Sequence, residues 1–156
     1  MKHFSAHYIF TGDTPPLKRG IISVDNDGTI VAVKDSGDNH TERPSAEFHN
    51  GIIIPGFVNC HCHLELSHMK GNMPSGKGLA DFLRNFRTKR DNRNESMLCS
   101  ASEADREMYT AGVVLCADIC NNRTTFDIKK KSRIRYISLL EVFGLHPEKA
   151  GRRMEK

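Results

Sequence analysis

The feature that most constrains the fold is a polar segment, PGFVNCHCHLELSHMKG, which runs from residue 55 to residue 71 directly after an apolar run. It holds three histidines, two cysteines and a glutamate, all of which are side chains that bind metal ions. The stretch GIIIPGFVNCHCH has the composition of two short strands separated by a Pro-Gly break. The sequence therefore places potential metal ligands at the end of a strand.

The direction of each side chain decides which of these residues can act together. If residues 57–63 form a strand, their side chains alternate between two faces. One face then carries Phe57, Asn59, His61 and His63. Cys60 and Cys62 point the other way and are interpreted as packing residues. The spacing alone favours two ordinary surface histidines, but the preceding strand and the following loop favour a pair that binds one metal ion.

The order of elements after residue 55 indicates an α/β fold. We predict helices over residues 79–90 and 100–112, the second ending at Gly112 as a C-terminal stop, and strands over residues 113–120 and 133–144. The continuous apolar run of residues 113–120 is typical of a strand covered on both faces. A further helix is expected to begin near Pro147. Strands that alternate with helices indicate βα units and a parallel sheet. In such folds the active site lies at the carboxyl ends of the strands.

The first part of the chain is expected to be β-rich. Two β-branched runs flank the turn sequence NDG at residues 26–28, which predicts a hairpin because glycine takes the positive φ that such turns need. Residues 35–45 are polar and predict a surface loop. We therefore divide the chain into a β-rich segment, residues 1–54, and an α/β segment, residues 55–156.

Composition and charge narrow the class of protein. With 38% hydrophobic and 27% charged residues, the chain is typical of a globular protein. It has no apolar run long enough for a membrane span, and its N-terminus does not resemble a signal peptide. We therefore expect a cytoplasmic protein with reduced cysteines and no membrane partner. The segment from Arg123 to Lys156 is basic, with ten Lys/Arg and four Asp/Glu. Because no aromatic residues are interspersed among these basic residues, we expect a solvated surface rather than a nucleic-acid site.

The segment GIIIPGFVNCHCHLELSHMKG resembles the signature of the amidohydrolase superfamily, in the branch of cytosine-deaminase-like and chlorohydrolase-like enzymes. In that family a Pro-Gly-Phe/Leu-Val/Ile-Asn segment leads into a His-x-His metal pair. The stretches GLADFL, GVVLCADICNN and LLEVFG are also similar to the family's first helix and its second and third barrel strands. The resemblance covers nearly the whole chain.

The resemblance implies a (β/α)₈ TIM-type barrel joined to a small β-sandwich built from both chain ends. It implies one divalent ion, zinc or iron, held by His61, His63, two later histidines and an aspartate. Such an ion lowers the pKa of a bound water, which attacks an sp² carbon of a small heterocyclic substrate. A carboxylate from a later strand moves the proton. The expected activity is deaminase-like hydrolysis of C–N bonds. A homo-oligomer is compatible with the full-length protein.

The chain is too short for the whole of that fold. A (β/α)₈ barrel needs about 250 residues, and about three of its eight βα units are expected here. We therefore expect an inactive N-terminal fragment with no catalytic residue of its own, since His146 matches no ligand position and catalytic zinc takes three protein ligands. Glu65 and His68 are candidate substrate contacts at the loop side of the metal pair. The alternatives are a solvated loop position or a buried salt bridge for Glu65, and an ordinary loop histidine for His68.

Two other motifs suggest different chemistry. Residues 71–78, GNMPSGKG, nearly match a phosphate-binding loop, with Asp118 as its magnesium carboxylate, but Gly78 stands where a Ser or Thr is needed. Residues 63–65 match the His-x-Glu of small cytidine deaminases, but the later cysteines lack the Pro-Cys-x-x-Cys spacing. Both interpretations therefore have weak support.

A non-catalytic role is the third alternative. An incomplete parallel sheet exposes its edge and an apolar face, which favours binding to another chain. The sequence is therefore also compatible with a metal-binding or interaction fragment, or with a pseudoenzyme.

Overall fold

The computed structural model describes residues 1–35, 46–73, 76, 78–89, 94–142 and 151. The chain divides into two units, Met1–Pro55 and Gly56–Lys156, each with its own sheet. Almost all of the predicted loop at residues 35–45, the predicted helix near Pro147, and His146 lie outside the described residues. No helix among the described residues is long and apolar enough to span a membrane.

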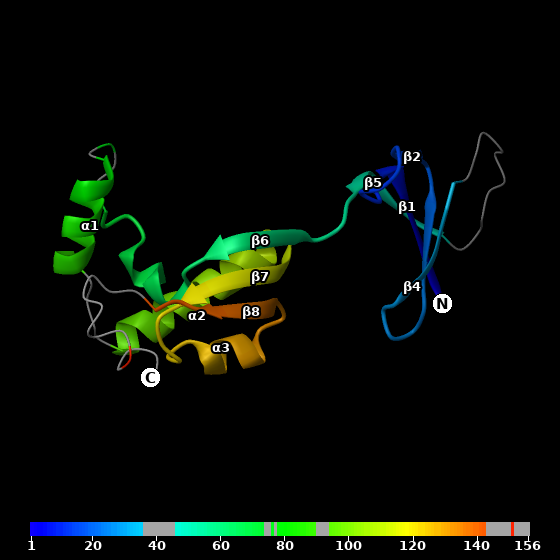
Figure 1. Ribbon diagram of the computed structural model, residues 1–156. Helices are drawn as coiled ribbons and strands as arrows, with labels where there is room; N and C mark the ends of the chain where they lie inside the picture. The colour runs from blue at the N-terminus through cyan, green and yellow to red at the C-terminus, as the bar shows by residue number, and fades with distance from the viewer. Residues whose placement is uncertain (36–45, 74–75, 77, 90–93, 143–150, 152–156) are drawn as a thin grey trace. The chain divides into compact units, whose positions relative to one another are not determined.

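The first unit is a five-stranded sheet of β1 (Lys2–Ile9), β2 (Leu17–Lys18), β3 (Ile21–Val24), β4 (Ile30–Lys34) and β5 (Ala46–Ile53). β1 pairs antiparallel with β2 and β3 and parallel with β5, and β4 pairs antiparallel with β3 (Figure 1). Its buried apolar side chains are Ala6, Ile9, Ile21 and Ile22. The prediction of short strands in this part of the chain is confirmed.

The turn between β3 and β4 shows why the hairpin signal was reliable. The amide of Asp25 donates to the carbonyl of Thr29 at 3.0 Å, and the carboxylate of Asp25 accepts the amide of Thr29 at 2.9 Å. Gly28 has a φ of +93°, a conformation that residues with a side chain rarely adopt. The predicted hairpin is therefore confirmed.

The second unit contains β6 (Phe57–Cys62), the 3₁₀ helix η1 (Leu64–Met69), α1 (Gly78–Lys89), α2 (Asn94–Thr110), β7 (Val113–Cys120), α3 (Phe126–Lys131) and β8 (Arg135–Leu140). The three strands form a sheet in the order β6-β7-β8, and both pairings are parallel. The predicted parallel sheet is confirmed. α2 begins earlier than predicted, and the segment after β6 forms η1 rather than a loop.

Two glycines allow β6 to start beside β7. Gly112 follows α2 with a φ of +90°, as its predicted role at the helix end requires, and its carbonyl accepts the amide of Phe57 at 2.9 Å. A Cβ on Gly56 would overlap the side chain of Val114 in β7. The glycine of the Pro-Gly break therefore leaves room for Val114, which a larger residue at this position would displace.

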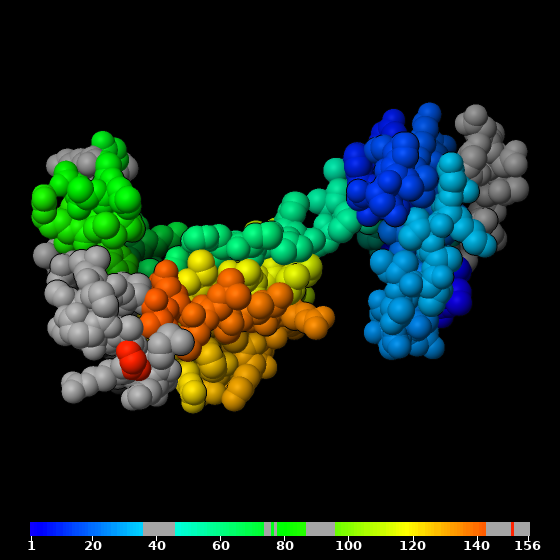
Figure 2. Space-filling view, in the orientation of Figure 1, coloured from blue at the N-terminus to red at the C-terminus, as the bar shows by residue number. Residues whose placement is uncertain are grey.

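The two faces of β7 differ in burial. Cys116, Asp118 and Cys120 of β7 point to the face that packs against the helices, and all three are fully buried. The opposite face, called here the open face, carries the apolar side chains of Val58, Leu115, Ala117, Ile119, Ile137 and Leu139, with Arg135 beside Leu115. Figure 2 shows the three strands at the surface of this unit.

The prediction that the strand at residues 113–120 is covered on both faces is wrong for the described residues. The side chains of β7 on the open face are only half-buried, and Ile137 and Leu139 of β8 are 51% and 48% exposed. The physical reason is that the described helices of this unit leave that side of the sheet without a second layer. An apolar face of this kind costs free energy in water.

Helix α1 is confirmed, and it presents its apolar stripe to solvent within the described structure. Leu79, Phe82 and Leu83 are 72%, 44% and 51% exposed. The rings of Phe82 and Phe86 stack with their centroids 6.0 Å apart. An ion pair between Asp81 and Arg84, 2.9 Å long, lies on the same helix and contributes little because both residues face water.

Two isoleucines test this division of the sheet. Ile134 is 2% exposed and Ile137 is 51% exposed. We expect Ile134→Ala to lower the free energy of unfolding of the second unit by about 2–5 kcal/mol, because it leaves a cavity. The matched change Ile137→Ala should cost less than about 1 kcal/mol. Urea unfolding followed by the amide signals of β7 measures both, and equal losses would contradict the one-sided core.

Candidate functional site

The two histidines of the His-x-His pair lie side by side at the end of β6. The ring centroids of His61 and His63 are 5.2 Å apart, with an angle of 63° between the ring planes. His61 is exposed and His63 is half-buried. Among the described residues, neither imidazole has a hydrogen-bond partner. The ring nitrogens of both residues are therefore available as ligands, and the prediction that the two rings share one side is confirmed.

An irregularity in β6 produces this arrangement. Asn59 pairs with Cys116 of β7, and Cys62 pairs with Asp118, so three residues of β6 span two of β7. Because Cys116 and Asp118 are on one face of β7, Asn59 and Cys62 both point to the helix-covered face. The prediction that Asn59 shares a face with His61 is therefore wrong.

Asn59 is a residue whose role the sequence did not reveal. Its side-chain amide donates to the sulfur of Met108 in α2 at 3.5 Å, and its side-chain oxygen accepts the backbone amide of His61 at 3.1 Å. One carboxamide thus holds the irregular stretch of β6 against the helix behind it. The strand signal alone could not show this, because it depends on the register with β7.

The two cysteines of the segment differ from each other. Cys62 is partly buried beside Cys116 and Asp118, and this burial, followed by those two neighbours, raises the pKa of its thiol to about 12. It packs away from the histidine pair, as predicted. Cys60 is exposed, so its predicted packing role is wrong, because the irregularity in β6 turns it to solvent.

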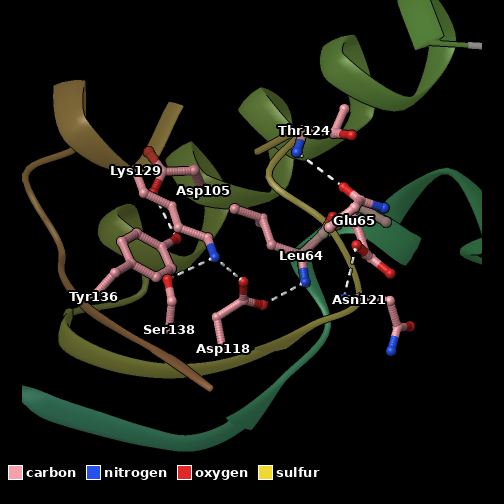
Figure 3. A network of polar contacts seen from close by, with 11 residues as sticks. Leu64, Glu65, Asp105, Asp118, Asn121, Thr124, Lys129, Tyr136 and Ser138 are labelled. Carbon is pink, nitrogen blue, oxygen red and sulfur yellow. Dashed lines mark hydrogen bonds and ion pairs between the residues drawn. The ribbon is translucent and has the colours of Figure 1, made fainter. Parts of the chain in front are cut away.

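A buried carboxylate holds the chain immediately after the pair. Asp118 is fully buried and forms an ion pair with Lys129 of α3. Its second oxygen accepts the backbone amide of Leu64 at 2.7 Å. Lys129 also donates to the hydroxyl of Ser138 in β8 at 3.0 Å (Figure 3). Asp118 is thus occupied by Lys129 and Leu64, which gives no support to its alternative role as a magnesium ligand.

A second polar cluster ties α2 to β8. The hydroxyls of Ser132 and Tyr136 both donate to one carboxylate oxygen of Asp105, at 2.6 and 2.7 Å. Burial and the nearby Asp105 raise the pKa of Tyr136, so its hydroxyl stays protonated as a donor. Lys129 lies over the Tyr136 ring at 5.8 Å from its centroid, which connects this cluster to Asp118.

Glu65, one of the two candidate substrate contacts, is buried. Its side chain is 1% exposed, and its carboxylate accepts the backbone amide of Asn121, just after β7, at 3.3 Å. The carboxylate thus ties η1 to the end of β7. The burial agrees with the structural alternative for Glu65, but the partner shown is a backbone amide rather than a cation, and a contact with substrate stays a prediction.

His68, the other candidate, has one ring nitrogen available. Its Nδ1 lies 3.1 Å from the carbonyl of Glu65, and because a carbonyl only accepts, Nδ1 carries the proton. Its Nε2 is buried and has no partner among the described residues. Nε2 is therefore the ring nitrogen left without a partner, and a contact of His68 with substrate stays a prediction.

The donor set fits part of a metal site. Imidazole nitrogens suit zinc and iron, and the rings of His61 and His63 are close enough for one ion to contact both. Within the described residues there is no group of three or more His, Cys, Asp or Glu side chains that could hold a metal ion. Two ligands are fewer than the three that catalytic zinc normally takes, so the described residues supply an incomplete set.

Comparison with known proteins gives similarity at the level of the fold. No protein-family model and no curated protein matches the chain. Among solved structures, the chain is similar to Helicobacter pylori aminofutalosine deaminase in complex with methylthio-coformycin, with a TM-score of 0.80 and 20% identity over 99% of this chain and 39% of that one.

Two further structures are of the same kind. Atrazine chlorohydrolase TrzN from Arthrobacter aurescens TC1, complexed with zinc, has a TM-score of 0.73 and 21% identity over 95% of this chain and 37% of that one. Guanine deaminase from C. acetobutylicum, with guanine in its active site, has a TM-score of 0.67 and 21% identity over 88% of this chain and 35% of that one. The chain thus spans about two-fifths of the length of these enzymes, and the shared feature is the fold.

The environment of the cysteines predicts their reactivity. With a pKa of about 12, Cys62 is almost entirely protonated at pH 8, and burial also raises the pKa of Cys116 and Cys120. We expect iodoacetamide at pH 8 to alkylate the exposed Cys60 and Cys99 first, since only the thiolate reacts. Tandem mass spectrometry of timed digests measures the order. In urea all five cysteines should react at similar rates. Equal alkylation rates for Cys60 and Cys62 in the folded protein would contradict the burial of Cys62.

Proposed function

We propose that the chain is the N-terminal part of a metal-dependent amidohydrolase with deaminase-like chemistry on a small heterocyclic substrate. The observation that carries this is the pair of imidazoles of His61 and His63 at the carboxyl end of a parallel strand. Their ring centroids are 5.2 Å apart, and neither ring is hydrogen-bonded to a described residue. Support comes from the similarity in fold to two deaminases and a chlorohydrolase. The resemblance of the sequence to the amidohydrolase signature points the same way.

His61 and His63 would bind one divalent ion, zinc or iron. A bound ion of this kind supplies a water of lowered pKa near neutral pH, which is the nucleophile that hydrolytic deamination needs. The chain itself would contribute neutral imidazole donors and their fixed direction. Zinc in the chlorohydrolase supports this choice, although iron would suit the same donors.

The carboxylates near the pair are assigned to structure in this proposal. Asp118 is held by Lys129 and Leu64, and Glu65 accepts the amide of Asn121. A general base must reach the proton that it removes, and these buried groups instead hold the backbone. The proton-transferring group and the remaining ligands are therefore proposed to lie outside the described residues, on further strands of a (β/α)₈ barrel of which β6, β7 and β8 are the first three.

The substrate would bind over the carboxyl ends of the strands. His68 Nε2 is buried and has no partner among the described residues, so His68, like the buried Glu65, would touch substrate only after η1 moves. In the present arrangement Glu65 acts through the backbone amide of Asn121. The heterocyclic class follows from the similar enzymes, one of which has guanine bound. A cytoplasmic full-length enzyme that assembles with copies of itself is part of the proposal.

A second candidate is a non-catalytic binding fragment, and the open face favours it. Ile137 and Leu139 are half-exposed in the described structure, and an apolar face of this kind favours association with another chain. In this case the 156-residue chain would elute in size-exclusion chromatography as an oligomer or as an aggregate. A monomeric elution volume at micromolar concentration would argue against it.

Single-histidine variants test the metal pair. We expect His61→Asn and His63→Asn each to weaken Zn²⁺ binding at least about tenfold, because each removes one of only two donors. His49→Asn is the matched control, since His49 is exposed in the first unit, where its ring lies against Phe4 and its Nε2 pairs with Glu47. Isothermal titration calorimetry measures the affinities. Unchanged affinity in both site variants would refute the pair.

The fragment proposal has its own test. The purified 156-residue chain, loaded with Zn²⁺, is expected to release no ammonia from guanine or related amino-heterocycles, because it lacks a third ligand among its described residues. A coupled ammonia assay measures this. Turnover with one metal ion per chain would show that the chain is a complete enzyme.

A further inference from the structure

We propose that Asp118 is a positioning residue for the metal pair: its carboxylate fixes the backbone directly after His63, and Lys129 fixes that carboxylate. This inference rests on the proposed function, because it assigns Asp118 to the support of the two ligands. Neither residue contacts the imidazoles or would contact the ion. Their contribution is to the direction of His63.

The hydrogen bond between the Leu64 amide and Asp118 acts on the backbone directly beside His63. His63 has a φ of −128° and a ψ of 77°, and it caps η1 without a side-chain hydrogen bond of its own. The next peptide N–H, that of Leu64, is buried and donates to Asp118 at 2.7 Å. Since ψ of a residue sets where the next N–H points, this bond restrains the torsion beside the His63 side chain.

The carboxylate is itself held from two elements. Lys129 comes from α3, and its side chain is only 5% exposed where it pairs with Asp118. It also donates to Ser138 of β8 and lies 5.0 Å from the ring centroid of Phe126. One ammonium group therefore links α3, β7 and β8 and keeps the acceptor for Leu64 in one place (Figure 3).

Stability alone is a weak reason for this arrangement. A buried ion pair can often be replaced by apolar side chains of similar volume with no loss of stability, whereas removal of one partner is costly. An apolar pair would fill the space, but it could not accept the N–H of Leu64. Metal-binding side chains must be held within about 0.5 Å of their productive positions. Loss of a group that orients such a side chain typically lowers metal affinity about 10–100-fold. The hydrogen bond is the part that an apolar core cannot replace.

Two matched double variants separate positioning from packing. Lys129→Met with Asp118→Asn removes both charges but keeps an oxygen that can accept the N–H of Leu64. Lys129→Met with Asp118→Leu removes both charges and the acceptor, with similar volume. We expect Zn²⁺ affinity within about threefold of the parent for the first variant and about 10–100-fold weaker for the second. Affinities refer to the folded fraction, measured by calorimetry after urea unfolding has given the stability of each variant.

A second readout does not depend on metal. In the metal-free protein, NMR should show contacts between the rings of His61 and His63 and slow exchange of the Leu64 amide. Both should persist in the Asn variant and be lost in the Leu variant. If the parent fails to bind Zn²⁺, the proposed metal site is refuted, and this readout alone decides the positioning role. Equal Zn²⁺ affinity of the two folded variants, or unchanged ring contacts in both, would overturn it.

A backbone change covers the case in which the Leu variant does not fold. Replacing Leu64 by its α-hydroxy acid analogue, by chemical ligation, turns the 63–64 amide into an ester and removes only the N–H. Asp118 and Lys129 then stay intact. Loss of the ring contacts between His61 and His63 in the ester protein would support the positioning role, and their persistence would overturn it.

Discussion

The hydrogen bond from the Leu64 amide to the buried carboxylate of Asp118 is the constraint on which the candidate site depends. It joins the end of β6 to the end of β7, and Lys129 extends the connection to α3 and β8. Without it, the chain would leave β6 with a free torsion beside His63. The irregular pairing between Asn59 and Cys62 acts at the other end of the same short segment, where the Asn59 side chain holds the amide of His61. The His-x-His pair is thus held by backbone contacts on both sides.

The position of the pair follows from the topology. Parallel strands end together at one edge, and βα folds place their chemistry there. In the second unit the described helices cover one face of the sheet, and the open face carries apolar side chains such as Ile137 and Leu139. The chain covers 35–39% of the length of the three solved structures that share this fold.

Local signals were sufficient for much of the fold. The NDG turn, the stop at Gly112 and the strand composition of residues 113–120 depend on backbone conformation and on runs of apolar residues, and each was predicted from the sequence. The irregularity at Asn59 and the exposure of Cys60 within it depend on the register of β6 with β7, and the ion pair of Lys129 depends on the packing of α3 against β7. No local pattern contains either. The sequence did contain one signal for the ion pair. Asp118 lies within the apolar run VVLCADIC, and a buried aspartate needs a charged or hydrogen-bonding partner.

The central claim is that two imidazoles, without cysteine, are this chain's contribution to a metal site. X-ray absorption at the zinc edge, on the chain with one equivalent of Zn²⁺, tests it most directly. We expect two imidazole nitrogens at about 2.0–2.1 Å from the zinc, with oxygen ligands completing its coordination shell. A sulfur ligand at about 2.3 Å, or the absence of imidazole scattering, would contradict it.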